Sequence, residues 1–242
     1  MERPLRQKAE LDWREDGAPV SRRHGEAYFG AADALAEARH VFLGGNDLPE
    51  RFGGGAPLHV AELGFGTGLN LLATVLAWNG RGVLRYTSFE AYPMTAEEMA
   101  RALGRWPEFA PLAGPLAAAW AAGERRFMLQ GVAVEVIEGD ARATLPGLDW
   151  RADAWFLDGF SPARNPELWE PGLLREVARH SAPGATLATF SAAGGVRSAL
   201  AEAGFAVERV PGYGAKKHMT RARLPIAEAP RRALSLPELS LD

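Results

Sequence analysis

The chain has 242 residues, which suits one large α/β domain and is too short for two complete enzymatic domains. The absence of cysteine excludes disulfides, thiolate zinc sites and a cysteine nucleophile. A formal net charge of −3 argues against a protein that coats nucleic acid, so any RNA contact should be local. No apolar run approaches the roughly 20 residues of a membrane span, and the N-terminus lacks a signal-peptide core, so we expect a cytoplasmic protein without a membrane partner.

The chain divides into three parts by composition. Residues 1–57 are expected to form an irregular extension that packs on the core, with one helix near residues 31–39. Residues 58–223 have the strand and helix patterns of the core domain. Residues 224–242 contain three prolines and scattered charges, which predicts a flexible tail.

Strand and helix patterns alternate along the core. Strands are expected at 59–64, 83–90, 132–140, 152–158, 185–190, 205–210 and 218–223. Helices are expected at 69–78, from Thr95 to before Pro107, at 171–180 and at 196–203. Leu69, Leu72, Ala73 and Leu76 share one helical face, Asn79-Gly80 ends that helix, and Thr95 with Glu98 forms a capping box. This alternation predicts a Rossmann-like, doubly wound α/β fold whose mostly parallel sheet ends in a C-terminal antiparallel strand.

A glycine-rich loop, Glu62-Leu-Gly64-Phe-Gly66-Thr-Gly68-Leu-Asn70, joins the first strand to the first helix of the core. Such glycines let the backbone turn sharply and approach a ligand closely. A dinucleotide fingerprint needs a third glycine five positions after the first, where this chain has Leu69. The carboxylate of Glu62 also suits a cationic ligand and repels a pyrophosphate. The loop therefore favours S-adenosylmethionine (SAM), which carries a sulfonium and an ammonium group.

Acidic residues at the ends of the next strands support the same ligand. Glu90 ends the second strand, where its carboxylate is expected to accept the ribose hydroxyls, and Asp140 ends the third, placed to hold the adenine amine. One acidic residue at a strand end is weak evidence, since such residues are often solvated. Three beside a glycine loop indicate a ligand site, because open α/β sheets bind ligands at the carboxyl ends of their strands.

Asp158 follows the fourth strand within the segment Asp-Gly-Phe-Ser-Pro. The alternative role is that of a turn former or helix cap. The functional interpretation is a carboxylate that orients an amine opposite the methyl group. Methyl transfer involves little proton chemistry, so positioning carries much of the rate. Asp158 is therefore the candidate catalytic residue.

With these residues in hand, the sequence resembles the methyltransferase domain of the bifunctional tRNA-modification enzyme MnmC and its stand-alone form MnmD, a class I SAM-dependent methyltransferase family. The matching segments span residues 28–219 and include ELGFGTGLN, SFEAYPMT, DAWFLDGFSPARNPELW and GYGAKKHM. The first segment is typical of SAM enzymes in general. DGFSPARNPELW, together with NDLPERF at residues 46–52, is more particular to this family.

The resemblance implies methylation of 5-aminomethyl-(2-thio)uridine at the tRNA wobble position, with the anticodon loop as partner. It carries SAM contacts onto the following residues: Glu62, Gly64, Phe65, Gly66, Gly68, Asn70, Glu90, Asp140, Ala141 and Asp158. Bifunctional members continue into a flavin-dependent oxidase domain. This chain ends at Asp242 without one, so no FAD is expected and another enzyme would supply the amine.

Candidates for the RNA side are aromatic and basic residues. Tyr28 and Phe160, and also Trp169, are candidates to stack on the base, although core packing is the commoner role of such rings. Arg164, Lys216 and Lys217, with Arg22 and Arg23, are candidates to meet the backbone, although each alone suits a solvated surface. The five histidines show no metal-ligand spacing, so no metal is expected.

Three other functions remain open from the sequence. An aminopropyltransferase or a small-molecule amine methyltransferase would use the same fold and would suit the negative net charge. A dinucleotide oxidoreductase is disfavoured by the glycine spacing and by Glu62. A non-catalytic SAM-fold scaffold is disfavoured because the loop and Asp158 are intact. Oligomeric state is not predicted.

Overall fold

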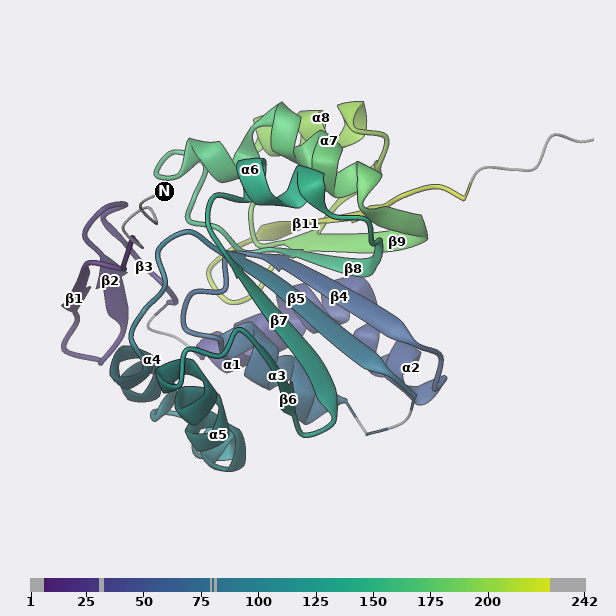
Figure 1. Ribbon diagram of the computed structural model, residues 1–242. Coiled ribbons are helices and arrows are strands. Elements are labelled where there is room, and N and C mark those ends of the chain that lie inside the picture. The colour runs from purple at the N-terminus through teal and green to yellow at the C-terminus, as the bar shows by residue number, and fades with distance from the viewer. Residues whose placement is uncertain (1–6, 31–32, 79, 81, 227–242) are drawn as a thin grey trace, which may run out of the picture.

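The computed structural model describes residues 7–30, 33–78, 80 and 82–226, and its centre is an eight-stranded sheet with helices on both faces (Figure 1). The strands lie in the order β10-β11-β9-β8-β4-β5-β7-β6. Their bounds are Leu58–Leu63 (β4), Leu84–Glu90 (β5), Arg126–Leu129 (β6), Val132–Glu138 (β7), Ala152–Leu157 (β8), Ser181–Thr189 (β9), Ala206–Pro211 (β10) and His218–Arg223 (β11). All seven predicted strands of the core are present.

The five central strands β4, β5, β7, β8 and β9 run parallel, and β6, β10 and β11 run antiparallel to their neighbours. The predicted parallel sheet with an antiparallel C-terminal end is therefore confirmed. β4 pairs with both β5 and β8, whereas β5 is the next strand in sequence and β8 comes much later. The strand order thus reverses at β4, and a ligand crevice is expected at the carboxyl end of this strand.

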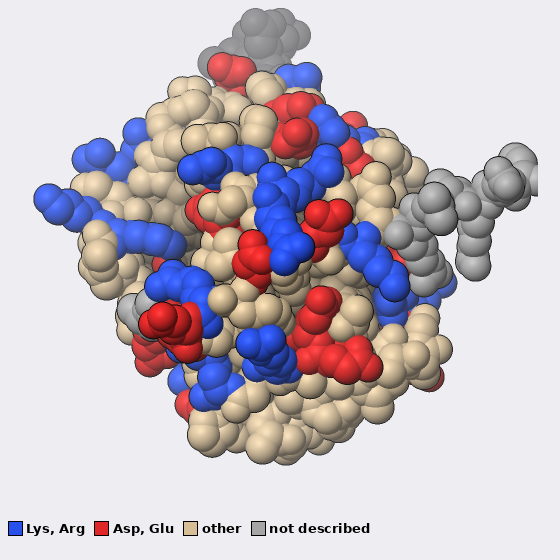
Figure 2. All heavy atoms as spheres, turned by 90° about the vertical axis from the view of Figure 1, so that its left-hand side faces the viewer, with Lys and Arg blue, Asp and Glu red and all other residues tan. Residues whose placement is uncertain are grey.

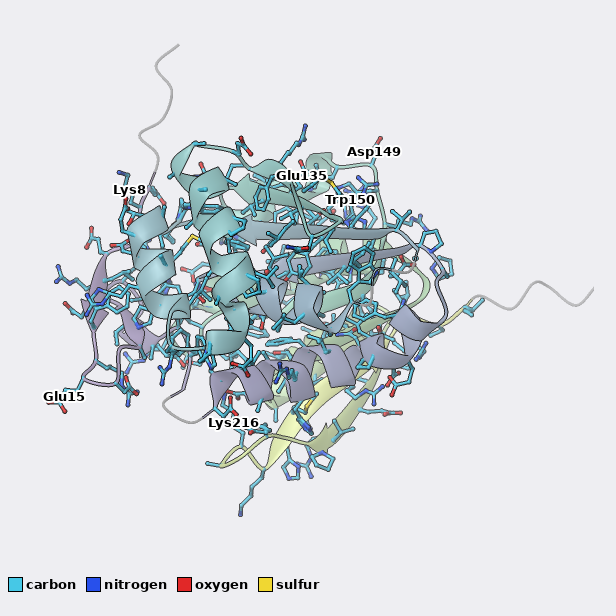
Figure 3. All side chains as sticks on the ribbon, turned by 90° about the horizontal axis from the view of Figure 1, so that it is seen from below. Lys8, Glu15, Glu135, Asp149, Trp150 and Lys216 are labelled. Atoms are coloured by element: carbon cyan, nitrogen blue, oxygen red, sulfur yellow. The ribbon has the colours of Figure 1, made fainter. Side chains whose placement is uncertain are left out.

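Helices cover the two faces of the sheet. They are Ala34–Ala38 (α1), Leu48–Gly53 (α2), Leu69–Ala77 (α3), Ala96–Leu103 (α4), Ala110–Ala121 (α5), Ala141–Thr144 (α6), Pro171–Arg179 (α7) and Gly194–Glu202 (α8). The packing follows strand alternation: Val60 joins the core cluster of α1, α3, α4 and α5, while its neighbour Ala61 joins that of α7 and α8. Figure 1 shows α6, α7 and α8 above the sheet and the other helices below it, and Figure 3 shows the lower face.

The structure confirms the predicted capping box of α4 but not the whole predicted apolar face of α3. Both halves of the predicted capping box are formed, since Glu98 Oε2 accepts from the Thr95 amide at 2.7 Å and Thr95 Oγ1 accepts from the Glu98 amide at 3.2 Å. The predicted apolar face of α3 is wrong at Leu76, which is 38% exposed. α3 packs against both the sheet and α1, so every residue from 69 to 75 is buried and the single-stripe pattern does not apply.

The N-terminal region is more regular than predicted. Three short strands, Leu11–Trp13 (β1), Pro19–Ser21 (β2) and Glu26–Ala27 (β3), form a separate antiparallel sheet. The predicted helix near 31–39 is α1, and it continues into a π-helical turn at Arg39–Leu43 that packs on α3 and β9. These strands are too short for a detectable alternation.

α5 and β6 were also not predicted. α5 contains Pro115 and Gly114, two residues that disfavour a helix interior. Most of the predicted tail, residues 227–242, and Asn79 of the predicted helix stop lie outside the described residues. Leu224 does not belong to a free tail, because its backbone bonds to Gly184 and Ala185 of β9.

Candidate functional site

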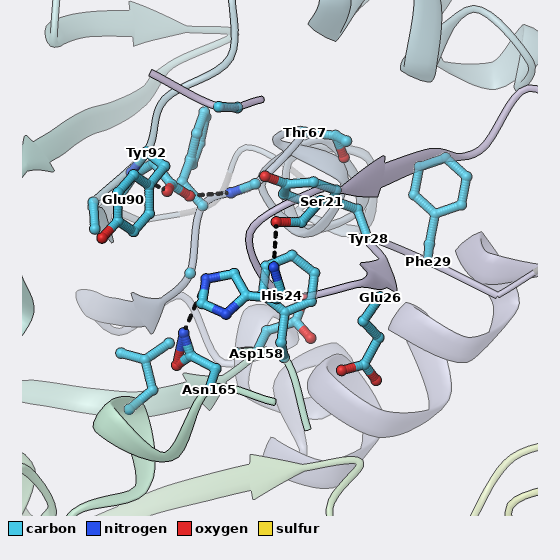
Figure 4. Close-up of a pocket in the computed structure, with 18 of the residues that line it drawn as sticks. Ser21, His24, Glu26, Tyr28, Phe29, Thr67, Glu90, Tyr92, Asp158 and Asn165 are labelled. Carbon is cyan, nitrogen blue, oxygen red and sulfur yellow. Dashed lines mark hydrogen bonds between the residues drawn. The ribbon is translucent and has the colours of Figure 1, made fainter. Parts of the chain in front are cut away.

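A cavity of about 1490 Å³ opens at the carboxyl ends of β4, β5, β7 and β8 (Figure 4). One wall is the glycine loop, with Gly64, Gly66 and Asn70. Glu90 and Asp140 line the side beyond β5 and β7, and residues 158–160 line the side beyond β8. The N-terminal sheet and α1 close the remaining side. The structure thus brings the residues predicted at the strand ends to one cavity.

Two glycines of the loop are required by close approach. Gly64 has φ +93°, and a Cβ there would overlap the backbone carbonyl oxygen of Asp158. Gly66 has φ +54°, and its Cβ would lie 3.1 Å from Cδ1 of Tyr28. Gly68 was also predicted to touch the cofactor, but it packs toward Leu116 and is absent from the cavity wall. Of the three loop glycines, Gly64 and Gly66 therefore leave open backbone at the cavity.

Glu62 lies behind the loop. It is fully buried, and its carboxylate accepts from Asn70 Nδ2 at 2.9 Å and from Ser88 Oγ at 2.7 Å. The predicted direct contact between Glu62 and a cationic ligand is not supported, because the residue does not line the cavity. The reason is geometric: Glu62 is the second-last residue of β4, so its side chain points under the glycine loop.

Asn70 joins Glu62 to the cavity. The same Nδ2 atom donates to Asp158 Oδ2 at 2.6 Å, so this amide bridges the two carboxyl groups. Asn70 was predicted as a cofactor contact, and the structure adds this bridging role. The second oxygen of Asp158 has no hydrogen-bond partner among the described residues. It is therefore available to a ligand in the cavity.

Burial sets the protonation of both carboxyl groups. It raises the pKa of Glu62 to about 8, opposed by the Ser88 hydrogen bond and reinforced by the nearby Asp158 charge. Burial also raises the pKa of Asp158 to about 7, opposed by Asn70 and Lys216 and reinforced by Glu37. At neutral pH Asp158 can therefore both carry a charge and accept a proton.

Glu90 holds the loop in place. Its Oε2 accepts from the Gly66 amide at 2.8 Å and its Oε1 from the Tyr92 amide at 2.7 Å. Burial raises the pKa of Glu90, while these two amides act in the opposite direction. Each carboxylate oxygen has two lone pairs, so the predicted contact with ribose hydroxyls remains open to Glu90.

Asp140 is already paired. Its Oδ1 accepts from the Arg142 amide at 2.9 Å, and its Oδ2 lies 2.6 Å from the Arg142 guanidinium. The hydrogen bond from Arg142 lowers the pKa of Asp140. Ala141, the first residue of α6, is buried and lines the cavity beside it. Phe65 also reaches the cavity wall, although its ring stacks on Trp120 at 5.1 Å.

The turn after β2 and the first residue of β3 supply site residues that sequence reasoning missed. Glu26 accepts from both the amide and the hydroxyl of Ser161 at 2.9 Å. The His24 ring stacks on Phe160 at 4.7 Å, and its Nδ1 lies 2.9 Å from the carbonyl oxygen of Arg164. These contacts fix the segment after β8. No spacing in the sequence pairs residues 24–26 with residues 160–164, so the pattern gave no indication of them.

The predicted aromatic residues meet at the same place. The rings of Tyr28 and Phe160 lie edge to face with centroids 4.9 Å apart, and both side chains line the cavity. Burial raises the pKa of Tyr28, so this phenol stays neutral. Trp169 is instead buried in the core and donates to the Phe160 carbonyl at 2.8 Å. Tyr28 and Phe160 therefore remain the candidates for contact with a planar group.

The predicted basic residues separate in space. Lys216 lines the cavity, with Nζ 2.6 Å from Glu37 Oε1 and 4.3 Å from the Phe190 ring centroid, and Figure 3 shows it beside α1. Lys217 is exposed and outside the cavity wall. Arg164 is exposed near Gly25, also outside that wall. Arg22 and Arg23 also line the cavity, so three members of this group, Arg22, Arg23 and Lys216, face the site.

The cavity fits SAM on its own geometry. Gly64 and Gly66 leave room for a chain to pass against bare backbone, and the carboxylates of Glu90, Asp140 and Asp158 suit a ligand with two cationic groups and two hydroxyls. Within the described ranges, no group of three His, Asp or Glu side chains is arranged to hold a metal ion. No helix in the same ranges is long and apolar enough to cross a membrane.

Comparison with known proteins identifies the family. Residues 107–225 match the model of an S-adenosyl-L-methionine-dependent methyltransferase family. The chain is 48% identical over 233 residues to the tRNA 5-methylaminomethyl-2-thiouridine biosynthesis bifunctional protein MnmC of Stutzerimonas stutzeri, covering 90% of this chain and 35% of that protein. It is 45% identical over 224 residues to the protein of the same name from Chromobacterium violaceum, covering 88% and 34%. The chain thus spans about a third of the length of these relatives.

A solved structure supports the same fold. The crystal structure of MNMC2 from Aquifex aeolicus superposes with a TM-score of 0.69 at 24% identity, covering 91% of this chain and 72% of that one. The family match argues against the dinucleotide oxidoreductase alternative, since its members use SAM. The chain therefore has the class I fold of the SAM-dependent methyltransferases, matches the model of one such family over residues 107–225, and is similar in sequence to part of the bifunctional MnmC proteins.

Proposed function

We propose that this enzyme methylates the side-chain amine of 5-aminomethyl-(2-thio)uridine at the wobble position of tRNA, giving the 5-methylaminomethyl form. The observation that carries the proposal is the identity of 48% to MnmC over 90% of the chain. The relatives' name refers to 5-methylaminomethyl-2-thiouridine biosynthesis in tRNA. Such an activity belongs in the cytoplasm, with the anticodon loop as partner.

Asp158 is the acceptor for the amine in this proposal. An alkylamine is largely protonated at neutral pH, and its ammonium group would bind the free oxygen of Asp158. The pKa of about 7 lets the carboxylate take a proton from the amine, after which a remaining N–H bond aims the nitrogen lone pair. When bound, SAM would supply an electrophilic methyl group, whose bond to the sulfonium breaks as the amine nitrogen forms its bond to carbon. Asn70 holds the other oxygen of Asp158 throughout.

The aromatic side of the cavity suits a pyrimidine ring. The edge-to-face pair of Tyr28 and Phe160 borders the cavity near Asp158, so a base could lie against Phe160 with its substituent toward the carboxylate. Bases in an anticodon loop are unpaired, so the wobble base can enter without the melting of a duplex. The residues proposed to bind the base and those proposed to bind SAM therefore line the same cavity.

Mass spectrometry of tRNA nucleosides tests the proposal. Purified enzyme with SAM should convert 5-aminomethyluridine in tRNA to the 5-methylaminomethyl form, with a mass gain of one methylene group. Calorimetric titration with decarboxylated SAM tests the aminopropyltransferase alternative on the same preparation. Tight binding of decarboxylated SAM without methylation of tRNA would overturn the proposal.

A further inference from the structure

Three arginines lie over aromatic rings without also pairing with a carboxylate, unlike Arg125, which does both. Six arginines of the described chain pair with carboxylates at 2.9 Å or less: Arg22, Arg125, Arg126, Arg142, Arg179 and Arg221. Arg23, Arg101 and Arg105 have no carboxylate partner within the described ranges. Each instead lies over an aromatic ring. Their positive charges are therefore uncompensated by direct ion pairs.

The stacking distances are short. The guanidinium carbon of Arg101 lies 3.8 Å from the Trp13 ring centroid, and that of Arg23 lies 4.5 Å from the Tyr92 centroid. Arg105 lies 5.4 Å from the Phe29 centroid and 5.2 Å from that of Trp106. A ring fixes the plane of a guanidinium group and leaves its N–H edge free. These arginines are thus oriented before any ligand arrives.

Arg23 lines the cavity, and Arg101 and Arg105 lie over the rings of Trp13 and Phe29 in the N-terminal segment that forms one side of it. Arg23 is in the β2–β3 turn and lines the cavity itself. Arg101 is in α4 and Arg105 follows that helix, and both are exposed. Phe29, which Arg105 contacts, also lines the cavity. Figure 2 shows this face of the molecule, on which Lys and Arg side chains are spread among acidic ones.

We infer that Arg23, Arg101 and Arg105 form a docking ledge for the sugar-phosphate backbone of a single-stranded RNA loop whose base enters the cavity. This inference rests on the proposed function for the identity of that RNA. A planar guanidinium with a free edge binds phosphate through two parallel hydrogen bonds, and no carboxylate competes for these groups. A chain with a net charge of −3 needs such a local cationic surface to hold RNA.

The alternative is that these contacts only join the N-terminal sheet to α4, since Arg101 lies against Trp13 of β1. The two roles respond differently to salt. Phosphate contacts release counterions, so each lost contact flattens the plot of log affinity against log salt by about 0.7 for single strands. If the arginines only join the N-terminal sheet to α4, their replacement should lower thermal stability and leave the salt dependence of RNA affinity unchanged.

The test measures binding of a fluorescent anticodon stem-loop to the full chain by anisotropy, at several KCl concentrations. The stem-loop carries plain uridine at the wobble position, so no methyl transfer is involved. We expect Arg23→Gln/Arg101→Gln/Arg105→Gln to flatten the slope by about 2, and each single change by about 0.7. Arg101→Lys should keep the slope, because the charge remains. Arg175→Gln is the matched control, since Arg175 is an exposed arginine of α7 outside the cavity wall.

The outcomes separate the ledge from the proposed function. An unchanged slope in the triple and single variants, with a lowered thermal midpoint, would make the arginines structural and overturn the ledge. Equal displacement of the stem-loop by poly-L-glutamate would point to an acidic polypeptide and also overturn it. If wild-type enzyme fails to methylate aminomethylated tRNA while the triple variant still flattens the slope, the proposed function fails and the ledge stands.

Discussion

Replacing Asp158 by Asn removes one charge from the cavity while keeping the local packing. The carbonyl oxygen of an Asn side chain can still accept from Asn70 Nδ2, now 2.6 Å from Asp158 Oδ2, so the loop should keep its position. The variant loses two functions that the carboxylate supplies: attraction for the substrate ammonium and, with a pKa of about 7, acceptance of its proton. The fold is expected to be unaffected, because burial of the charged form is unfavourable at this site.

The size of the effect follows from these two losses. A hydrogen bond to a charged group contributes about 1.5–3 kcal/mol, or roughly 10- to 150-fold. Loss of a positioned proton acceptor costs about 10²–10⁴-fold, so we expect kcat to fall within roughly that range. The wild-type rate should rise with pH through about 7 as Asp158 deprotonates, and this step should vanish in the variant, leaving the later rise caused by the free amine.

This expectation can be checked by single-turnover methylation of aminomethylated tRNA between pH 6 and 9. This range extends roughly one to two units on either side of the pKa of Asp158. SAM affinity measured by calorimetry should change much less than kcat. Glu167→Gln is the control, because Glu167 is an exposed carboxylate at the rim of the same cavity. Near-wild-type turnover of Asp158→Asn across the pH range would refute the mechanism and leave Asp158 a structural residue.

Three further changes test the loop and its supports. Gly64→Ala should lower the free energy of unfolding by at least about 2 kcal/mol in thermal or urea unfolding, because φ is +93° and the new Cβ meets the Asp158 carbonyl. Glu90→Ala should weaken SAM binding roughly 10- to 150-fold in calorimetry, and a change under about twofold would place the carboxylate outside the ligand contacts. The raised pKa of Glu62, about 8, means that the folded protein loses stability as pH rises from 4.5 toward 8, by up to about 5 kcal/mol in total. Glu62→Gln should reduce this dependence in urea unfolding and leave the part caused by Asp158, and an identical pH profile in wild type and variant would contradict the burial argument.

The core was predictable because its patterns are local. Strand alternation, the capping box of Thr95 and Glu98, and the glycine loop each lie within a few residues of sequence, and all three are present. The positions of Glu90 and Asp140 at the cavity followed from one rule, that the carboxyl ends of parallel strands share an edge.

The remaining features depend on contacts between distant segments. Glu62 follows the alternation of β4, but its burial beneath the loop depends on Asn70 and Ser88 of two other elements. Lys216 and Lys217 are neighbours in sequence, and only the first turns toward the cavity, where Glu37 holds it. α5 was missed because its prolines and glycine obscure a buried stripe of Leu112, Leu116 and Trp120.

The segment after β8 connects the cofactor side of the cavity to the N-terminal sheet. On one side Gly64 permits the carbonyl of Asp158 to approach the glycine loop, and on the other Glu26 binds Ser161 while His24 stacks on Phe160. The glycine loop joins β4 to α3 of the core, whereas the β2–β3 hairpin lies in the N-terminal region. Because Asp158, the proposed amine acceptor, lies between the two, we expect the N-terminal region to shape the side of the cavity that receives the substrate. Substrate choice should therefore be more sensitive to changes at residues 24–28 than SAM affinity is, since these residues reach Phe160 and border the glycine loop only at Gly66.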